Sequence, residues 1–224
     1  LEKVTSGNSN TGFGSDALGN STDGDFNTAV GSGALNDVLT GENNTAVGYN
    51  AGVNVSTGSG NTYIGKSAGL VDVGSNNIYI GEGSGSSVAS GNNNVILGSN
   101  TGNTISASSN NIIISDGSGN NRIQVDSGGN VGIGTSTIES YWSGYTALKV
   151  GYNNSIFGNT ADSVGSAFFI SQNLYNDGGN YRYVGSGSDE GGLIDLRGGA
   201  FVFSNAPLGT AGNIASIVPR LTIS

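Results

Sequence analysis

The side chains best suited to catalysis in this chain are a few carboxylates in its second half: Glu139, Asp189, Glu190 and Asp195. Two carboxyl groups held about 5–10 Å apart in a groove can cleave a glycosidic bond by acid-base chemistry. Asp189 and Glu190 lie in the glycine- and serine-rich stretch GSGSDEGG, which does not hold a pair in the fixed geometry that catalysis needs. The sequence therefore predicts a solvated acidic loop at this place, and we expect no enzyme.

Several other kinds of site are excluded by residue types that the chain lacks. None of the 224 residues is cysteine or histidine, which excludes a disulfide framework, a thiolate nucleophile, a Cys/His zinc site and a Ser-His-Asp triad. Calcium could bind an acidic turn such as SDGSG at 115–119, but the recurrent Asp of a calcium-binding nonapeptide ladder is missing. We expect no metal and no cofactor.

Charge and hydropathy restrict the partners. Seven basic and 16 acidic residues give a net charge of −9, which argues against binding to nucleic-acid phosphates. No run of 18 apolar residues occurs, so we expect no membrane insertion.

Aromatic side chains after residue 138 are candidates for binding rather than catalysis. Exposed Tyr and Trp rings offer flat apolar faces to sugars and a polar tip for hydrogen bonding. The single tryptophan and six of the nine tyrosines lie in this region. Two clusters are candidate glycan contacts: Tyr141, Trp142 and Tyr145, and then Tyr175, Tyr181 and Tyr183. Alternatively, these rings pack the interior of a small domain or a contact between chains. We expect receptor binding in residues 138–224.

An internal repeat organises the first half of the chain. The units NTGFG, NTAVG, NTAVG, NTYIG, NIYIG, NVILG and NIIIS follow one another at intervals of 16 or 17 residues. A spacing of two between apolar positions, with glycine in every copy, excludes a helix. A 17-residue unit with one short strand cannot bury its apolar face alone, so neighbouring units must stack. We predict a parallel β-solenoid or β-roll of about seven 17-residue coils.

Two columns of the repeat have predicted roles. The apolar residue at the fourth position is expected to point into the coil: Phe13, Val30, Val47, Ile64, Ile80, Leu97 and Ile114. The asparagine at the first position is expected to form a ladder at a turn, with side-chain amides bonded from coil to coil: Asn10, Asn27, Asn44, Asn61, Asn77, Asn94 and Asn111. The alternative for these asparagines is ordinary turn chemistry, because Asn tolerates a left-handed backbone.

A third column, of threonine, allows one further function. Thr11, Thr28, Thr45 and Thr62 stand at the second position of their units, where a hydroxyl array could bind ice. This column becomes Ile78, Val95 and Ile112 in later copies, and inward packing is the expectation for it.

The second half of the chain has no such period. RIQVDSGGNVGIGT (122–135) reads as strand, Gly-Gly turn and strand, which predicts a β-hairpin. The segments AFFIS (167–171), NYRYVG (180–185), LIDLRG (193–198) and AFVFS (200–204) predict the strands of a small antiparallel β-domain. The predicted organisation is a repeat shaft at 1–119, a hairpin linker at 120–150 and a β-rich knob at 151–224, with the chain expected to continue beyond both ends.

The repeats resemble two known families. NTAVGSGAL (27–35), NTAVGYNAG (44–52) and NTYIGKSAG (61–69) resemble the head repeats of trimeric autotransporter (YadA-like) adhesins and the repeats of long bacteriophage tail fibres. The string at 122–135, followed by ALKV (147–150), resembles a linker hairpin of phage tail fibres. The adhesin repeats form left-handed parallel β-rolls packed as trimers, with a period nearer 14, from which the 17-residue period departs.

The resemblance also implies a function. It implies a non-catalytic structural segment of a phage tail fibre that mediates host-surface attachment, located in the virion and outside cells. The implied partners are further copies of the chain in an intertwined homotrimer, neighbouring fibre segments, and a host glycan or surface protein. A bacterial trimeric surface adhesin or extracellular filament subunit is the alternative, and a polysaccharide-degrading tailspike is a third possibility.

Overall fold

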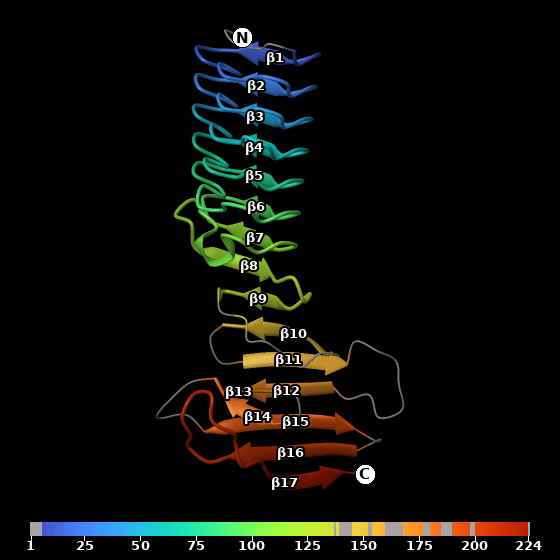
Figure 1. Cartoon of the computed structure of the whole chain (residues 1–224). Helices are drawn as coiled ribbons and strands as arrows, with labels where there is room; N and C mark the ends of the chain where they lie inside the picture. The colour runs from blue at the N-terminus through green and yellow to red at the C-terminus, as the bar shows by residue number, and fades with distance from the viewer. Residues whose placement is uncertain are drawn as a thin grey trace. The chain divides into compact units, whose positions relative to one another are not determined.

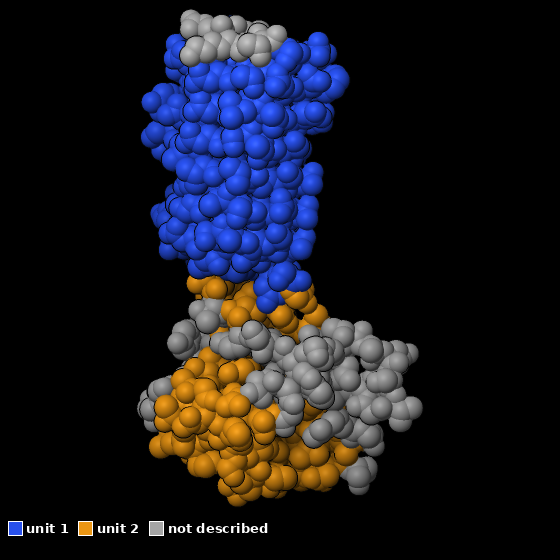
Figure 2. Space-filling model, viewed as in Figure 1, with its two compact units in different colours: residues 1–127 blue, residues 128–224 orange. Residues whose placement is uncertain are grey.

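The computed structural model describes residues 6–136, 138, 145–151, 154–159, 168–176, 180–184, 190–197 and 200–223. The chain forms two compact units, residues 1–127 (unit 1) and 128–224 (unit 2) (Figure 2). Apart from the 3-10 turn η1 (Asn103–Ile105), the regular elements of the described residues are all β-strands. The predicted fold class, a parallel β-solenoid plus a small antiparallel sheet, is confirmed.

Unit 1 is a stack of short parallel strands, one from each coil (Figure 1). Each strand pairs in register with the next, so that Thr28 lies opposite Thr45 and Val30 opposite Val47. The strands are β1 (Thr11–Phe13), β2 (Thr28–Val30), β3 (Thr45–Val47), β4 (Thr62–Ile64), β5 (Ile78–Ile80), β6 (Val95–Leu97) and β7 (Ile112–Ser115). The repeat in the sequence is therefore one coil of the solenoid.

A glycine ends most of these strands because the coils approach one another closely there. Gly48 has φ +140°, and a Cβ on it would lie 2.6 Å from the carbonyl oxygen of Gly65 in the next coil. No side chain fits in that gap, and L-residues rarely adopt that φ. The recurrence of glycine at this position is thus a direct consequence of stacking.

The interior of unit 1 is thin and consists mostly of small or aliphatic side chains. The middle residue of each strand from β2 to β7 points inward: Ala29, Ala46, Tyr63, Tyr79, Ile96 and Ile113. It packs against alanines of the following turn and against a further inner column: Ala17, Ala34, Ala51 and Ala68, with Val38, Val55, Val88 and Ile105.

The expectation that the fourth-position column points inward is wrong. Phe13 is 76% exposed, and Val47, Ile64, Ile80, Leu97 and Ile114 are 36–39% exposed, while Val30 is half-buried. The reason is strand alternation. The asparagine at position one is buried, so position three shares its side of the strand and positions two and four face outward. The threonine column, also expected inside, likewise lies on the outer face.

Unit 1 ends in a hairpin. Strand β8 (Asn121–Val125) runs antiparallel to β7, with a bulge between Ile114 and Ser115. The connecting turn is organised by Asp116, whose carboxylate accepts hydrogen bonds from the backbone N–H groups of Ser118 and Asn120 and pairs with Arg122. Hydrogen bonds from Asn120 and Arg122 lower the pKa of Asp116 to about 2. The first strand of the predicted linker hairpin is thus β8, which pairs with β7.

Unit 2 is built mainly from antiparallel strands. β9 (Val131–Ile133) runs parallel to β10 (Tyr145–Val150), and the sheet continues antiparallel through β11, β12, β15, β16 and β17. Their bounds are Asn154–Asn159, Phe168–Gln172, Gly191–Arg197, Ala200–Ala206 and Val218–Ile223. β13 (Leu174–Asn176) and β14 (Tyr181–Tyr183) form a separate two-stranded sheet.

The two faces of the main sheet in unit 2 differ in whether other residues pack against them. One face carries a buried cluster in which Phe157 stacks on Phe169 at 4.8 Å and Leu174, Tyr183 and Leu193 complete the packing. The other face presents exposed apolar side chains: Phe168, Ile170, Phe201, Phe203, Leu221 and Ile223. The described residues therefore cover only one of the two faces of this sheet.

Candidate functional site

The candidate functional surface of unit 1 is its outer stripe, which we define as positions two and four of β1 to β7 with Val125 and Ile123 of β8. One column is Phe13, Val30, Val47, Ile64, Ile80, Leu97, Ile114 and Ile123, and the other is Thr11, Thr28, Thr45, Thr62, Ile78, Val95, Ile112 and Val125. Neither column contains a charged residue. Strands in register lie about 4.8 Å apart, so both columns run straight along the sheet.

The composition of the outer stripe indicates contact with protein rather than with ice. The column of threonine hydroxyls at the second position ends at Thr62, and the next three coils carry Ile78, Val95 and Ile112 at that position. Contiguous apolar patches larger than a few hundred Å² are rare on monomeric soluble proteins and mark interaction surfaces. The outer stripe is therefore a candidate surface for contact with protein.

The asparagine column lies inside the coil and joins each strand to the next coil. In a typical case the backbone N–H of Asn44 donates to Oδ1 of Asn27 at 2.9 Å, and Nδ2 of Asn44 donates to the carbonyl oxygen of Gly58 at 2.8 Å. The equivalent N–H bonds recur at Asn27, Asn61, Asn77, Asn94 and Asn111. Each side chain thus bridges two neighbouring coils.

This ladder differs in detail from the expected amide-to-amide chain. Direct amide bonds join Asn44 to Asn27 at 3.1 Å and Asn111 to Asn94 at 3.0 Å. The other links run between side chain and backbone. The amides therefore satisfy backbone groups that the coil would otherwise bury without partners, and they hold the register on which the outer stripe depends.

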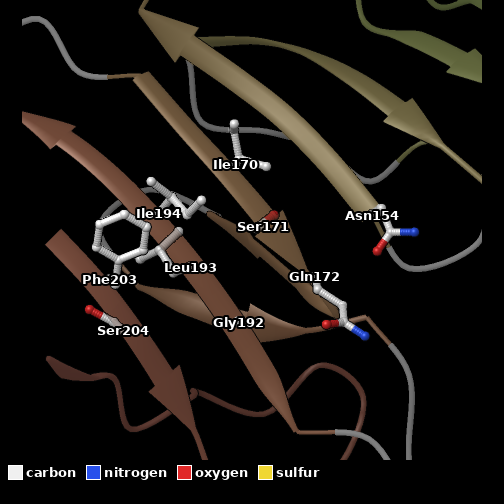
Figure 3. Close-up of a pocket in the computed structure, with 9 residues that line it drawn as sticks. All are labelled: Asn154, Ile170, Ser171, Gln172, Gly192, Leu193, Ile194, Phe203 and Ser204. Carbon is white, nitrogen blue, oxygen red and sulfur yellow. The ribbon is translucent and has the colours of Figure 1, made fainter. Parts of the chain in front are cut away.

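In unit 2, the uncovered sheet face contains a hollow of about 430 Å³. Gly192 lies between Gln172 and Asn205 on neighbouring strands, and its missing side chain leaves the space open. Ile194 and Phe203 lie on one side of the hollow, and Asn154 and Gln172 on the other (Figure 3). Its lining residues are Asn154, Ile170, Ser171, Gln172, Gly192, Leu193, Ile194, Phe203 and Ser204, none of them charged.

The structure does not bring the second predicted sugar cluster together. Tyr183 is buried and donates its hydroxyl to the carbonyl of Pro207, so its predicted role as an exposed sugar contact is wrong. Tyr181 is half-buried and packs edge-on against Phe169 at 6.0 Å. Tyr175 lies opposite Arg182 and therefore on the other face of the small sheet. Tyr183 and Tyr181 thus pack the interior of unit 2, in agreement with the alternative interpretation for these two rings.

Several other predicted residues lie outside the described part of the chain or apart from one another. Tyr141, Trp142, Glu139 and Asp189 are outside the described residues, as is the side chain of Tyr145. Glu190 is exposed, whereas Asp195 is buried on the covered face of β15. Within the described residues, no three Asp or Glu side chains gather where they could hold a metal ion.

Comparison of the chain with protein-family models, with curated proteins and with solved structures finds no match. The likeness to fibre and adhesin repeats therefore rests on the sequence motifs alone. None of the helical structure in the described residues is long and apolar enough to span a membrane. The described residues therefore form two candidate functional surfaces, the outer stripe of unit 1 and the uncovered face of unit 2.

The asparagine ladder predicts a specific loss of stability. Asn61→Ala removes the acceptor of the Asn77 N–H and the donor to the Gly74 carbonyl, both in the buried part of the coil. We expect a loss of about 2–4 kcal/mol in the free energy of unfolding, since each orphaned buried group costs roughly 1–3 kcal/mol. Urea unfolding followed by circular dichroism measures it. The control Asn54→Ala removes one exposed hydrogen bond, to Leu70, and should cost far less; equal losses would contradict the ladder's role.

Proposed function

We propose that this chain is a structural segment of a bacteriophage tail fibre that assembles with copies of itself as a homotrimer and helps attach the fibre to a host surface, without catalysis. The observation that carries the proposal is the outer stripe. It is a straight, uncharged, largely apolar sheet face on a unit whose own interior is thin.

A second copy of the chain fits the outer stripe better than an unrelated partner. The stripe repeats once per coil, and a parallel copy presents the same side chains at the same spacing. Each chain carries a net charge of −9, but neither column of the stripe contributes to it, so copies can approach there without placing like charges face to face. Each copy then uses the same surface, its outer stripe, for the contact.

Three copies are favoured by closure and by the family resemblance. Oligomers of identical chains close around a rotation axis. A three-fold axis along the stack keeps the copies parallel, as a fibre requires, and turns every outer stripe toward the axis. The extra burial compensates for a core in which alanine, valine and glycine predominate, because an isolated chain of this kind buries little area per residue.

The uncovered face of unit 2 supports the same proposal. Cross-strand rows such as Ile170, Ile194 and Phe203 are apolar and lie on the side opposite the buried cluster. A sheet with one covered and one bare apolar face is half of a two-layered core. In the proposed assembly, the matching faces of other copies supply the missing layer.

Two other functions remain as alternatives. A bacterial trimeric adhesin or extracellular filament subunit would use the same surfaces, and its flanking sequence would distinguish it, with a membrane-anchor barrel downstream for an adhesin. A polysaccharide-degrading tailspike would need a carboxylate pair in a groove; Glu190 and Asp195 provide no such pair, since one is exposed and the other is buried. Release of reducing sugar ends from host polysaccharide would favour the tailspike.

The proposed assembly predicts what a charge placed in the outer stripe would do. Ile80→Glu places one carboxylate per chain beside the axis of the proposed trimer, where the copies repel one another. We expect the mass measured by multi-angle light scattering to fall from three chains to one. Ser90→Glu, on the exposed part of the same coil, should leave the trimer intact. A monomeric wild-type chain at micromolar concentration would overturn the proposal.

Contact between copies through unit 2 can be tested with single cysteines, because the chain has none of its own. Leu221 and Thr222 are adjacent exposed residues of β17 whose side chains point to opposite faces of the sheet. We expect Leu221→Cys to cross-link between chains with a short bis-maleimide reagent, and Thr222→Cys not to. Equal cross-linking of the two variants, or none for Leu221→Cys, would show that this face is not the contact.

Host attachment is expected to depend on the aromatic residues after residue 138. Trp142→Ala should reduce binding of the full chain to host cells or to a glycan array by at least about tenfold, because Trp is a frequent energetic hot spot. Tyr49→Ala removes an exposed aromatic ring from unit 1 and is the matched control. If Tyr49→Ala reduces binding and Trp142→Ala does not, the shaft is the receptor-binding part.

A further inference from the structure

Two positions in the inner column of unit 1 break its apolar pattern, and one of them is ionisable. The residues eleven positions after the ladder asparagines from Asn10 to Asn94 are Ser21, Val38, Val55, Asp72, Val88 and Ile105, and all of them are buried. Asp72 therefore places a fully buried carboxyl group between valines of the coils on either side. A buried carboxylate without a counter-ion is costly unless hydrogen bonds compensate or the group is neutral.

The same coil is one residue shorter than its neighbours. The ladder interval from Asn61 to Asn77 is 16 residues, and the missing residue falls in the turn, where VSTG (55–58) and VASG (88–91) correspond to DVG (72–74). Oδ1 of Asp72 accepts the backbone N–H of Gly74 at 2.7 Å. The side chain thus closes the shortened turn.

The second carboxyl oxygen ties this turn to two neighbouring strands. Oδ2 of Asp72 accepts the hydroxyl of Tyr63 at 3.0 Å and Nδ2 of Asn77 at 2.8 Å. Asn77 is itself a member of the ladder. All three donors are neutral, and the ion pairs of the described residues, Lys66 with Glu82 and Arg122 with Asp116, do not include Asp72.

A fourth polar group, the hydroxyl of Tyr79, lies at this place. It is buried and has no partner at hydrogen-bond distance, although Asp72 and Asn94 lie near enough to shift its pKa. The rings of Tyr63 and Tyr79 are 5.8 Å apart. A protonated Asp72 could donate to this hydroxyl, and an ionised Asp72 could accept from it, so the hydroxyl can serve Asp72 in either state.

We propose that Asp72 makes the coil from Asn61 to Asn77 a pH-responsive joint of the shaft, held firmly when the carboxyl group is protonated and loosened when it ionises. The titratable groups that face Asp72 are Tyr63 from β4 and Tyr79 from β5, and the valines of the adjoining coils complete its surroundings. The joint lies within one chain, so it does not depend on the assembly proposed above.

The direction of the response follows from the sign of the pKa change. Burial raises the pKa of Asp72, in opposition to the interactions with Gly74, Tyr63, Asn77 and Tyr79, which lower it. Burial also raises the pKa of Tyr63 and Tyr79, so both hydroxyls stay protonated and Asp72 alone changes charge. A carboxyl whose pKa is higher folded than unfolded stabilises the fold below its ordinary pKa, and this stability is lost as the pH rises through the folded value.

The test compares the wild-type chain with Asp72→Asn, which is neutral at every pH. Melting temperatures are measured by differential scanning calorimetry between pH 4 and pH 7.5. We expect the melting temperature of the variant to rise relative to that of the wild type across this range, by about 2–4 °C for each kcal/mol of stability that the wild type loses as Asp72 ionises. Using the difference cancels contributions from other groups, including Asp116, whose low pKa works in the opposite direction.

Two further measurements keep the test decisive. Asp16→Asn makes the same chemical change at an exposed position of the first repeat and should show no pH-dependent gain. If Asp72→Asn does not fold, hydrogen exchange in the wild type serves instead: amide opening in residues 62–77 should increase between pH 4 and pH 7, relative to residues 28–44. A constant difference in melting temperature, or a constant ratio of opening, would show that its three donors keep Asp72 ionised throughout and would overturn the proposal.

Discussion

A buried asparagine at the start of each strand is the constraint on which the rest of unit 1 depends. Its side chain bonds to the backbone of the next coil, and these bonds are made only if the amide lies inside. Because side chains alternate along a strand, burying the first position also buries the third and turns the second and fourth outward. A polar ladder thus decides where the apolar residues go, and it places a column of Val, Ile and Leu on the surface.

This arrangement explains how a chain with so few hydrophobic residues can form a long regular structure. The interior can be thin and rich in alanine, because the ladder and the in-register strands supply hydrogen bonds from one coil to the next. The larger aliphatic side chains are then free for a surface that repeats with the coil. In the assembly proposed above, folding and association would use the same period, so a change in coil register would disturb both.

The sequence predicted the period, the strands and the solenoid, because each follows from residue spacing. It did not predict which apolar column faces inward, since the pattern Asn-x-apolar-apolar-Gly treats both columns alike. One signal does distinguish them. The residue eight positions after a ladder asparagine lies in the turn, beside the third-position residue of a strand. This turn residue is Leu18 or Leu35 where the third-position residue is small, and it is Gly52, Gly69 or Gly85 where the third-position residue is tyrosine. A Cβ on Gly52 would lie 2.7 Å from the ring of Tyr63. A large third-position residue thus occurs with a small turn residue, and a small one with a large turn residue. This compensation in side-chain size indicates that the third position faces the interior.

The shortened coil shows how far the repeat can vary. Most coils close their turns with backbone groups, as when the N–H groups of Leu39 and Thr40 both donate to Ser56. Removing one residue from the turn leaves a gap that backbone alone does not close, and the carboxyl group of Asp72 reaches across it to Gly74 and Asn77. The ladder distance is preserved at the expense of burying an ionisable group. In this shaft, the deletion falls at a turn where a side chain supplies hydrogen bonds of its own, and the shortened coil is therefore chemically distinct from its neighbours.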